Sequence, residues 1–294
     1  MGQPLPLLNM ATLLRIYRQC TRRLILFGLD GTLIQQEKVI AHLKNFQDFQ
    51  GHTLAPPPAA LHCLRALCAD PLNVVFVISG RSAADMEACL GNVDGLGLAA
   101  ELGFVQRRPG DSQWTQQRQL TAAQANWHEL AKPVLDRFTT RTNGAYLRWQ
   151  ESAALWCYQN ADPDFGRFQA HQLTLALRER LRGAGICVSN SMAKGQVEVR
   201  VAGVNKGAIA DEILRTTERL APVDFVLCVG DDDDDEYMLS AVTARSVCAD
   251  MCERLRHRLF TVTVGNKACS HANFVVQNSR DVLGILETLR TAAS

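Results

Sequence analysis

The sequence predicts an α/β protein in which a parallel sheet, with helices on both faces, is interrupted by a mixed α+β domain. Near both ends of the chain, short apolar runs alternate with longer helical patterns, which is typical of βαβ units. The middle, from about Arg107 to Arg200, differs because alternating strand patterns and helical stretches are mixed there. Gly or Asp closely follows the later apolar runs, as at the carboxyl edge of a parallel sheet, where open α/β sheets bind ligands.

Composition excludes several classes of protein. The 294 residues are 47% hydrophobic and 21% charged, which excludes collagen, a wholly disordered chain and a disulfide mini-protein. The formal charge is +1, so no global field recruits nucleic acid or an anionic membrane, and we expect neither as a partner. The ten cysteines form no CxxC pair. Reduced thiols in a cytoplasmic protein are therefore expected. No apolar stretch reaches the ~18 residues of a membrane span.

The first 29 residues contain four arginines and no acid, a pattern that also occurs in transit peptides. The apolar spacing between Leu13 and Tyr17 instead favours a short amphipathic helix that leads into the first strand. We expect that helix.

The core elements are predicted by apolar runs and helical spacing. A helix from 59 to 69 follows three prolines, which are tolerated at a helix start. Strands are predicted over residues 24–29, 74–78, 96–100 and 225–229.

The inserted domain is predicted over residues 107–200, which leaves a core of residues 1–106 and 201–294. Loop residues near Pro109 and Gly203 mark its entry and return. Between them we predict helices over 122–138 and 168–181 and strands over 153–158 and 197–200.

Four polar stretches follow the predicted strands of the core, and each alone could be a turn, a strand end or a solvated loop. They contain, in chain order, Asp30, then Ser79, then Lys206, then the acids Asp231 to Glu236. Carboxylates are ligands that Mg²⁺ prefers. A lysine offsets phosphoryl charge, and a hydroxyl with backbone amides can hold the phosphoryl oxygens. Together the four stretches predict a site for a phosphate and a divalent cation.

This order resembles the haloacid-dehalogenase-type phosphatases, whose first motif reads Asp-x-Asp-Gly-Thr. More closely, the chain is similar to the trehalose-6-phosphate phosphatases and to the phosphatase-like C-terminal domains of trehalose-phosphate synthases. The resemblance covers roughly residues 11–289 and is carried by residues 97–103, 160–166, 197–200, 203–207, 225–232 and 263–265. It implies a haloacid-dehalogenase-like Rossmannoid three-layer α/β/α core with an inserted α+β cap.

The resemblance also implies a role for each matching position. Asp30 would be the general acid/base and would touch Mg²⁺ through its backbone carbonyl. Ser79 and Lys206 would hold the phosphoryl group. The remaining implied roles are metal binding by Asp231 and Asp235, and substrate binding by Glu101, Glu198 and Arg81.

One departure from the family pattern decides the expected activity. The nucleophilic acid of the first motif falls at position 28, where this chain has Gly28. Glycine has no side chain that can attack phosphorus. By analogy with nucleophile knockouts, we expect turnover to fall on the order of 10⁶-fold. One metal carboxylate is also lost, so Mg²⁺ should bind more weakly.

Further departures lie on the sugar-facing side. The family's glutamate and lysine of the cap align with Arg148 and Glu151, so their charges are exchanged. Two expected histidines are replaced by Leu102 and Cys157.

Three hypotheses follow. The first is a catalytically impaired trehalose-6-phosphate phosphatase-like domain of trehalose biosynthesis, acting as a regulatory, assembly or sugar-phosphate-binding element. The second is an active Mg²⁺-dependent trehalose-6-phosphate phosphatase that releases trehalose and phosphate. The third is an interaction scaffold with an empty cleft. The expected partners are trehalose-6-phosphate or a related sugar phosphate, and a trehalose-phosphate synthase domain or subunit.

Overall fold

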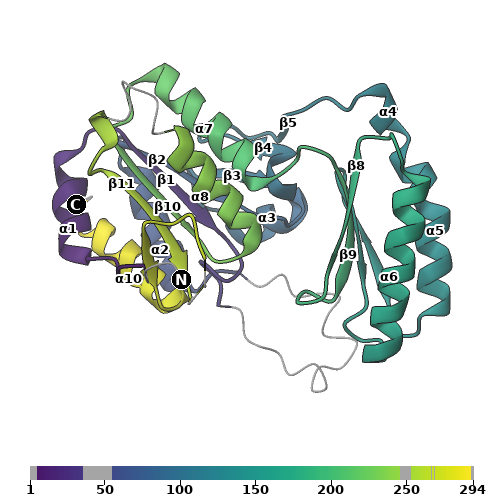
Figure 1. Ribbon diagram of the computed structural model, residues 1–294. Coiled ribbons are helices and arrows are strands. Elements are labelled where there is room, and N and C mark those ends of the chain that lie inside the picture. The colour runs from purple at the N-terminus through teal and green to yellow at the C-terminus, as the bar shows by residue number, and fades with distance from the viewer. Residues whose placement is uncertain (1–4, 36–54, 246–252, 266, 268, 293–294) are drawn as a thin grey trace. The chain divides into compact units, whose positions relative to one another are not determined.

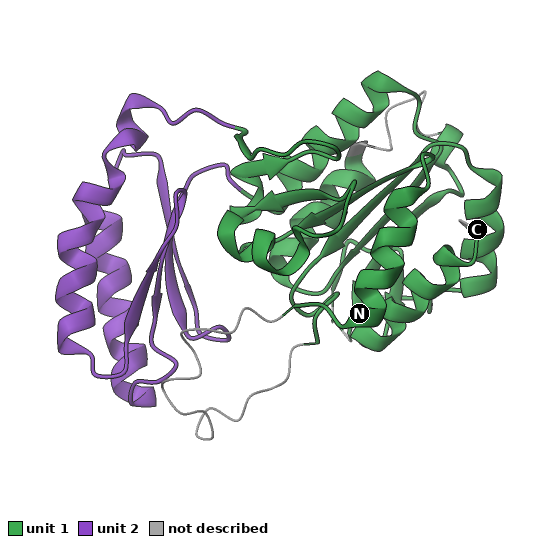
Figure 2. Cartoon of the chain, turned by 180° about the vertical axis from the view of Figure 1, so that it is seen from behind, with its two compact units in different colours: residues 1–38, 51–117, 205–294 green, residues 39–50, 118–204 purple. Residues whose placement is uncertain are grey.

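The structure is a computed structural model that describes residues 5–35, 55–245, 253–265, 267 and 269–292. The chain divides into two compact units (Figure 2). The core unit contains the described residues of Met1–Lys38, Gly51–Gln117 and Asn205–Ser294, and the second unit contains residues 118–204.

The core unit is built on an eight-stranded sheet of order β12-β11-β10-β1-β2-β3-β4-β5. The strands from β12 to β3 are parallel, and β4 and β5 are antiparallel additions at one edge. The bounds are β1 Arg23–Gly28, β2 Asn73–Ile78, β3 Gly97–Ala100, β4 Val105–Arg107, β5 Thr115–Gln116, β10 Phe225–Gly230, β11 Leu259–Val264 and β12 Phe274–Val276. The predicted parallel sheet is confirmed. Because β4 and β5 extend this sheet, the core unit continues to Gln117, whereas the predicted boundary lies after residue 106.

Helices cover both faces of this sheet (Figure 1). Leu24 and Leu26 of β1 pack with Ile213 of α7 and Leu239 of α8 in one buried cluster. On the other face, Tyr17 of α1 contacts Phe225 edge to face, and α10 packs beside α1 and α2. The bounds are α1 Met10–Gln19, α2 Pro58–Ala69, α3 Ala83–Leu90, η1 Glu101–Gly103, α7 Lys206–Leu220, α8 Asp233–Arg245 and α10 Ser279–Arg290.

The strand register aligns the polar stretches that follow the strands. Gly28 pairs with Ile78 of β2, and Phe27 pairs with Val229 of β10. All six residues of β1 are buried, because a central parallel strand is covered on both faces. The residues after β1, β2 and β10 therefore leave the sheet at one edge.

The second unit is an antiparallel sheet of order β6-β7-β9-β8 with helices packed on one face. The bounds are β6 Tyr146–Trp149, β7 Ala153–Cys157, β8 Ile186–Ser191, β9 Gln196–Val201, α4 Ala122–Ala125, α5 Trp127–Arg141 and α6 Pro163–Arg180. The single helix predicted over 122–138 is two helices, because Asn126 has a non-helical backbone (φ −103°, ψ 14°). The predicted α+β character of this segment is confirmed.

Two simpler features of the described residues are the state of their cysteines and the character of their helices. The described cysteines are free thiols, among them the buried Cys63 and Cys228. Within the described ranges, no helix combines the length and the apolar character that crossing a bilayer requires.

The helix α6 provides a matched test of core packing. Leu173 is fully buried, whereas Leu175 on the same helix is 50% exposed. We expect Leu173→Ala to lower the free energy of unfolding by about 2–5 kcal/mol, and Leu175→Ala to change it by about 0.5 kcal/mol or less. Urea denaturation of both variants measures the difference, and equal losses would contradict this packing.

Candidate functional site

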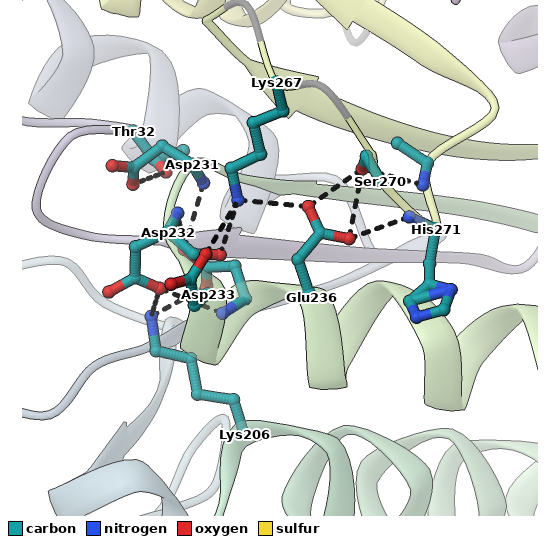
Figure 3. Close-up of polar contacts among 11 residues, drawn as sticks. Thr32, Lys206, Asp231, Asp232, Asp233, Glu236, Lys267, Ser270 and His271 are labelled. Atoms are coloured by element: carbon teal, nitrogen blue, oxygen red, sulfur yellow. Dashed lines mark hydrogen bonds and ion pairs between the residues drawn. The ribbon is translucent and has the colours of Figure 1, made fainter. Parts of the chain in front are cut away.

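The predicted site residues of the core lie at the carboxyl edge of the parallel sheet. Figure 3 shows two of them, Lys206 and Asp231, with their polar neighbours. Asp30 follows β1, Ser79 follows β2 and Asp231 follows β10, while Lys206 begins α7 and Asp235 lies in the first turn of α8. The sheet edge thus brings together five side chains from segments about 200 residues apart in the sequence.

A buried ion pair lies at the centre of this cluster. Asp235 has no solvent exposure. Its Oδ1 accepts from Lys206 Nζ at 2.7 Å, and its Oδ2 accepts from the backbone N–H groups of Asp231 and Asp232 at 3.0 and 3.2 Å. Burial favours a lower pKa for Lys206, but the carboxylates of Asp235 and Asp232 outweigh it and raise that pKa above its ordinary value. The ammonium is therefore charged and paired with carboxylates.

Asp231 lies beside this pair and faces the segment after β1. Its Oδ1 accepts from the hydroxyl of Thr32 at 2.9 Å. Burial and the charge of Asp235 raise the pKa of Asp231 to about 7. Gly31 makes this approach possible, because it adopts a left-handed φ of +79° and a Cβ there would lie 1.9 Å from Asp231 Oδ2.

Gly28 lies at the end of β1, with its Cα facing the same cluster. A Cβ at this position would lie 2.9 Å from Thr32 Oγ1 and 3.1 Å from both carboxylate oxygens of Asp235. The neighbouring polar groups thus occupy the space into which a longer side chain would extend.

Asp30 is paired with Arg81, the residue that the resemblance assigned to substrate binding. Arg81 Nε donates to Asp30 Oδ2 at 2.9 Å, and its Nη2 donates to Oδ1. The backbone N–H of Arg81 donates to the hydroxyl oxygen of the buried Ser79 at 3.1 Å. Arg81 therefore connects the predicted acid/base with the predicted phosphoryl ligand.

Glu101 and Leu102 form a left-handed turn after β3, with φ values of 49° and 58°. Such a conformation is costly for residues other than glycine. It is held by hydrogen bonds from the Glu101 N–H to the Arg81 carbonyl and from the Leu102 N–H to the Ser79 carbonyl, each 2.8 Å long. Both side chains are buried. The turn binds the end of β3 to the Ser79 segment.

The remaining predicted sugar-facing residues belong to the second unit. In β9, Glu198 accepts from Arg200 through both carboxylate oxygens, at 3.0 and 2.6 Å. Arg148 and Glu198 both pair in register with Leu155 of β7, so the three lie on one face of that sheet. Cys157 is buried in β7, and Glu151 lies between β6 and β7.

Sequence reasoning missed a lysine that holds the start of α8 from the other side. Lys267 Nζ donates to the carbonyl of Asp232 at 2.8 Å and to Glu236 at 3.0 Å. Glu236 also accepts from the Ser270 hydroxyl and the His271 N–H. Burial favours a higher pKa for Glu236, but these hydrogen bonds outweigh it and lower that pKa. The only sequence signal was the position of Lys267, two residues after the matching stretch 263–265.

Within the described ranges, no group of three or more His, Cys, Asp or Glu side chains is arranged to hold a metal ion. The carboxylate of Asp235 is already bound by Lys206 and two backbone amides, which leaves Asp231 as the carboxylate that faces the segment after β1.

Comparison with known proteins places this cluster in a family. The family model described as trehalose-phosphatase matches residues 47–279. The chain belongs to the trehalose-phosphatase family. This agrees with the fold, a haloacid-dehalogenase-like α/β core with an inserted α+β cap domain, which here is the second unit.

Relatives and solved structures cover most of the chain. A probable alpha,alpha-trehalose-phosphate synthase 9 (UDP-forming) of Arabidopsis thaliana is 33% identical over 95% of this chain. The trehalose-phosphatase of Schizosaccharomyces pombe is 33% identical over 79% of the chain. The C-terminal domain of the Candida albicans trehalose-6-phosphate phosphatase has a TM-score of 0.78 and 28% identity, covering 99% of this chain and 100% of that one. The chain spans only 30% of the Arabidopsis relative and 25% of the Schizosaccharomyces relative.

The buried ion pair predicts a strong coupling between Lys206 and Asp235. Lys206→Met leaves the carboxylate of Asp235 buried without its cation, so we expect a loss of about 3–5 kcal/mol in the free energy of unfolding. Adding Asp235→Asn removes the unpaired charge and should recover part of that loss. Urea denaturation of the two single variants and the double variant measures the coupling, and additive losses would contradict it.

The raised pKa of Asp231 predicts a pH dependence of stability. The pKa of Asp231 is higher in the folded state than the 3.8 of an ordinary aspartate. Ionisation of Asp231 therefore disfavours folding, and this contribution destabilises the protein as the pH rises from about 4 to 7. Asp231→Asn keeps an acceptor for the Thr32 hydroxyl and removes this pH-dependent contribution to the free energy of unfolding. We expect the variant to gain about 1–3 kcal/mol relative to the wild type between pH 5 and pH 8.

Thermal unfolding at several pH values measures this gain. Asp233→Asn is the matched control, because the Asp233 side chain is fully exposed. Parallel pH profiles for the wild type and Asp231→Asn would contradict the raised pKa.

Proposed function

We propose that this chain is a catalytically impaired trehalose-phosphatase-like domain that acts as a regulatory or sugar-phosphate-binding element of trehalose biosynthesis. The observation that carries the proposal is Gly28, which stands where the family motif has its nucleophilic acid. Its ligand would be trehalose-6-phosphate or a related sugar phosphate. A trehalose-phosphate synthase domain or subunit would be its partner, in line with the name of the longer Arabidopsis relative.

The surroundings of Gly28 support this proposal. Thr32 Oγ1 and both oxygens of Asp235 lie about 3 Å from the position of a Cβ at residue 28. A side chain there would require small shifts of a hydroxyl that is bonded to Asp231 and of a carboxylate that is bonded to Lys206. The space beside residue 28 is thus tight for any side chain larger than that of glycine.

The hydrogen bonds and ion pairs of the other site residues also support the proposal of an impaired domain. Both carboxylate oxygens of Asp30 bind Arg81, which holds this group away from the role of attacking or activating a nucleophile. Lys206 is paired with Asp235 and lies 3.6 Å from Asp232. Its charge is therefore balanced by carboxylates before any phosphate arrives, and anion binding should be weak.

Mg²⁺ fits the residues only in part. The Asp231 carboxylate and the backbone carbonyl of Asp30 could contribute oxygen ligands, and the first carboxylate of the family motif is lost at Gly28. A hard cation with one carboxylate and few further protein ligands keeps mostly water in its shell. We therefore infer weak Mg²⁺ binding, in which the ion would help to neutralise Asp231.

The alternative function is an active Mg²⁺-dependent trehalose-6-phosphate phosphatase. It is favoured by the positions of Ser79, Lys206 and Asp231 at one sheet edge with Asp30, and by the similarity to the Schizosaccharomyces trehalose-phosphatase. In that case a group other than residue 28 would have to start the reaction.

Phosphate release from trehalose-6-phosphate with Mg²⁺ separates the two functions. We expect no release above background from the purified wild-type chain. Turnover of about 1–10³ s⁻¹, the usual range of enzymes, would establish the alternative.

Gly28→Asp tests whether the loss is confined to one residue. The new carboxylate lies beside Asp235, so like-charge repulsion should lower the melting temperature without Mg²⁺. Mg²⁺ should raise the melting temperature of this variant more than that of the wild type, and should bind it roughly 10-fold more tightly. We expect slow hydrolysis of p-nitrophenyl phosphate. Trehalose-6-phosphate should remain a poor substrate, because Arg148, Glu151, Leu102 and Cys157 have changed the sugar-facing residues.

The matched control is Gly28→Asn, which has nearly the same size but no charge. It should match the steric cost of the aspartate without the Mg²⁺ response. Equal Mg²⁺ responses of the two variants would contradict a restored metal carboxylate. Equal rescue of both substrates would contradict the predicted change on the sugar-facing side.

A further inference from the structure

The amino edge of the core sheet, opposite the acidic cluster, is rich in arginine. Arg22 directly precedes β1, Asp224 directly precedes β10 and Arg258 directly precedes β11. The backbone N–H of Asp224 donates to the Arg22 carbonyl, and that of Val226 donates to the Arg258 carbonyl, each at 3.0 Å. Arg22 and Arg258 therefore flank Asp224 at the entrance to three neighbouring strands.

Two helices end at the same edge and add further arginines. Arg18 is exposed in the last turn of α1, four residues before Arg22. Arg219 is exposed in the last turn of α7, which ends at Leu220 shortly before β10 (Figure 1).

The nearby acids are already engaged with other groups. The Asp224 carboxylate accepts from the backbone N–H groups of Thr21 and Arg22 and from the Thr21 hydroxyl. Glu218 pairs with Arg254, and Asp70 pairs with the buried Arg23.

Within the described part of the chain, the arginines at the edge are left without such partners. Among the described residues, no ion pair is formed by Arg18, Arg22, Arg219 or Arg258. Within the same residues, the buried Nε of Arg22 has no hydrogen-bond acceptor. An unbonded buried N–H is costly.

Two exposed leucines lie among these arginines. Leu220 is 76% exposed at the end of α7, and Leu72 is 38% exposed directly before β2. The Leu72 carbonyl accepts from the Arg23 N–H at 2.8 Å, which fixes it beside Arg22. Between Leu72 and Arg258 the edge crosses the ends of the four adjacent strands β2, β1, β10 and β11. The width of these four strands is about 14 Å at the usual strand spacing.

We propose that this amino-edge surface, defined by Arg18, Arg22, Leu72, Arg219, Leu220 and Arg258, docks a protein partner that presents carboxylates around apolar side chains. Guanidinium groups match carboxylates in bidentate geometry, and arginine is enriched in protein interfaces. The exposed leucines favour a protein over a phosphate backbone, because they gain from burial against apolar side chains. The surface is separate from the acidic cluster, so the proposal stands whether or not the chain hydrolyses phosphate esters.

The test measures binding of the full chain to the part of the Arabidopsis relative that lies outside its matched region. That relative is about three times as long as its match with this chain, so it contains the protein surface that accompanies such a domain. We expect binding at 50 mM NaCl that weakens roughly 10-fold at 300 mM, because screened charge pairs contribute to it.

Two variants change only exposed side chains, so we expect both to fold as the wild type does. We expect the double variant Arg18→Glu/Arg219→Glu, and separately Leu220→Asp, to weaken binding at least ~10-fold at 50 mM NaCl. The matched control is Arg108→Glu, an exposed arginine between β4 and β5 of the same unit. It should bind as the wild type does, and unchanged melting temperatures would show that all variants are folded.

Several outcomes would overturn the proposal. Absence of binding at 50 mM NaCl would do so, as would equal affinities of the double variant and the Arg108 control. Tighter binding to single-stranded poly(dT) or to vesicles containing 30% phosphatidylserine, lost in the double variant, would assign the surface to nucleic acid or membrane instead. Self-association in sedimentation that the double variant abolishes would assign it to a second copy of the chain.

Discussion

The buried ion pair between Lys206 and Asp235 is the interaction on which the site of the core unit depends. Lys206 begins α7, and Asp235 lies in the first turn of α8, so the pair joins the two helices that cover one face of the sheet. The same carboxylate accepts two backbone amides of the turn after β10. A carboxylate buried this deeply needs both its cation and its hydrogen bonds to remain ionised. The pair therefore fixes the turn that carries Asp231.

The pair also gives a reason why motif residues of a phosphatase are present in a chain that has Gly28 where the family motif has its nucleophilic acid. A lysine that serves a phosphate must have charge left over for the incoming anion. Here Lys206 is balanced by Asp235 and Asp232, and Arg81 is balanced by Asp30. These side chains contribute to the folded structure itself, so their retention does not require turnover. This reasoning supports the proposal of an impaired phosphatase-like domain.

The gathering of the site residues was predictable from the sequence, because apolar runs identify parallel strands and such strands end at one edge of a sheet. Strands over 74–78 and 225–229 lie within one residue of their predicted ends. The partners of each side chain were not predictable. Whether Arg81 binds a substrate or Asp30 depends on side-chain directions, and the position of Lys267 depends on the path of the segment after β11. The short strand β12 escaped prediction because its run is brief and only partly buried.

Net charge describes a whole protein, whereas partners meet individual surfaces. The formal charge of +1 gives no strong global field, yet arginines lie at one edge of the core sheet and carboxylates lie at the other. The central strand β1, with six residues of about 3.3 Å each, separates the two edges by about 20 Å. At 0.15 M salt the Debye length is about 8 Å, so a change at Gly28 has little electrostatic effect on the amino edge. The fold can therefore lose its chemistry at one edge while the surface at the other edge keeps its charge, which makes a non-catalytic role physically accessible to this domain.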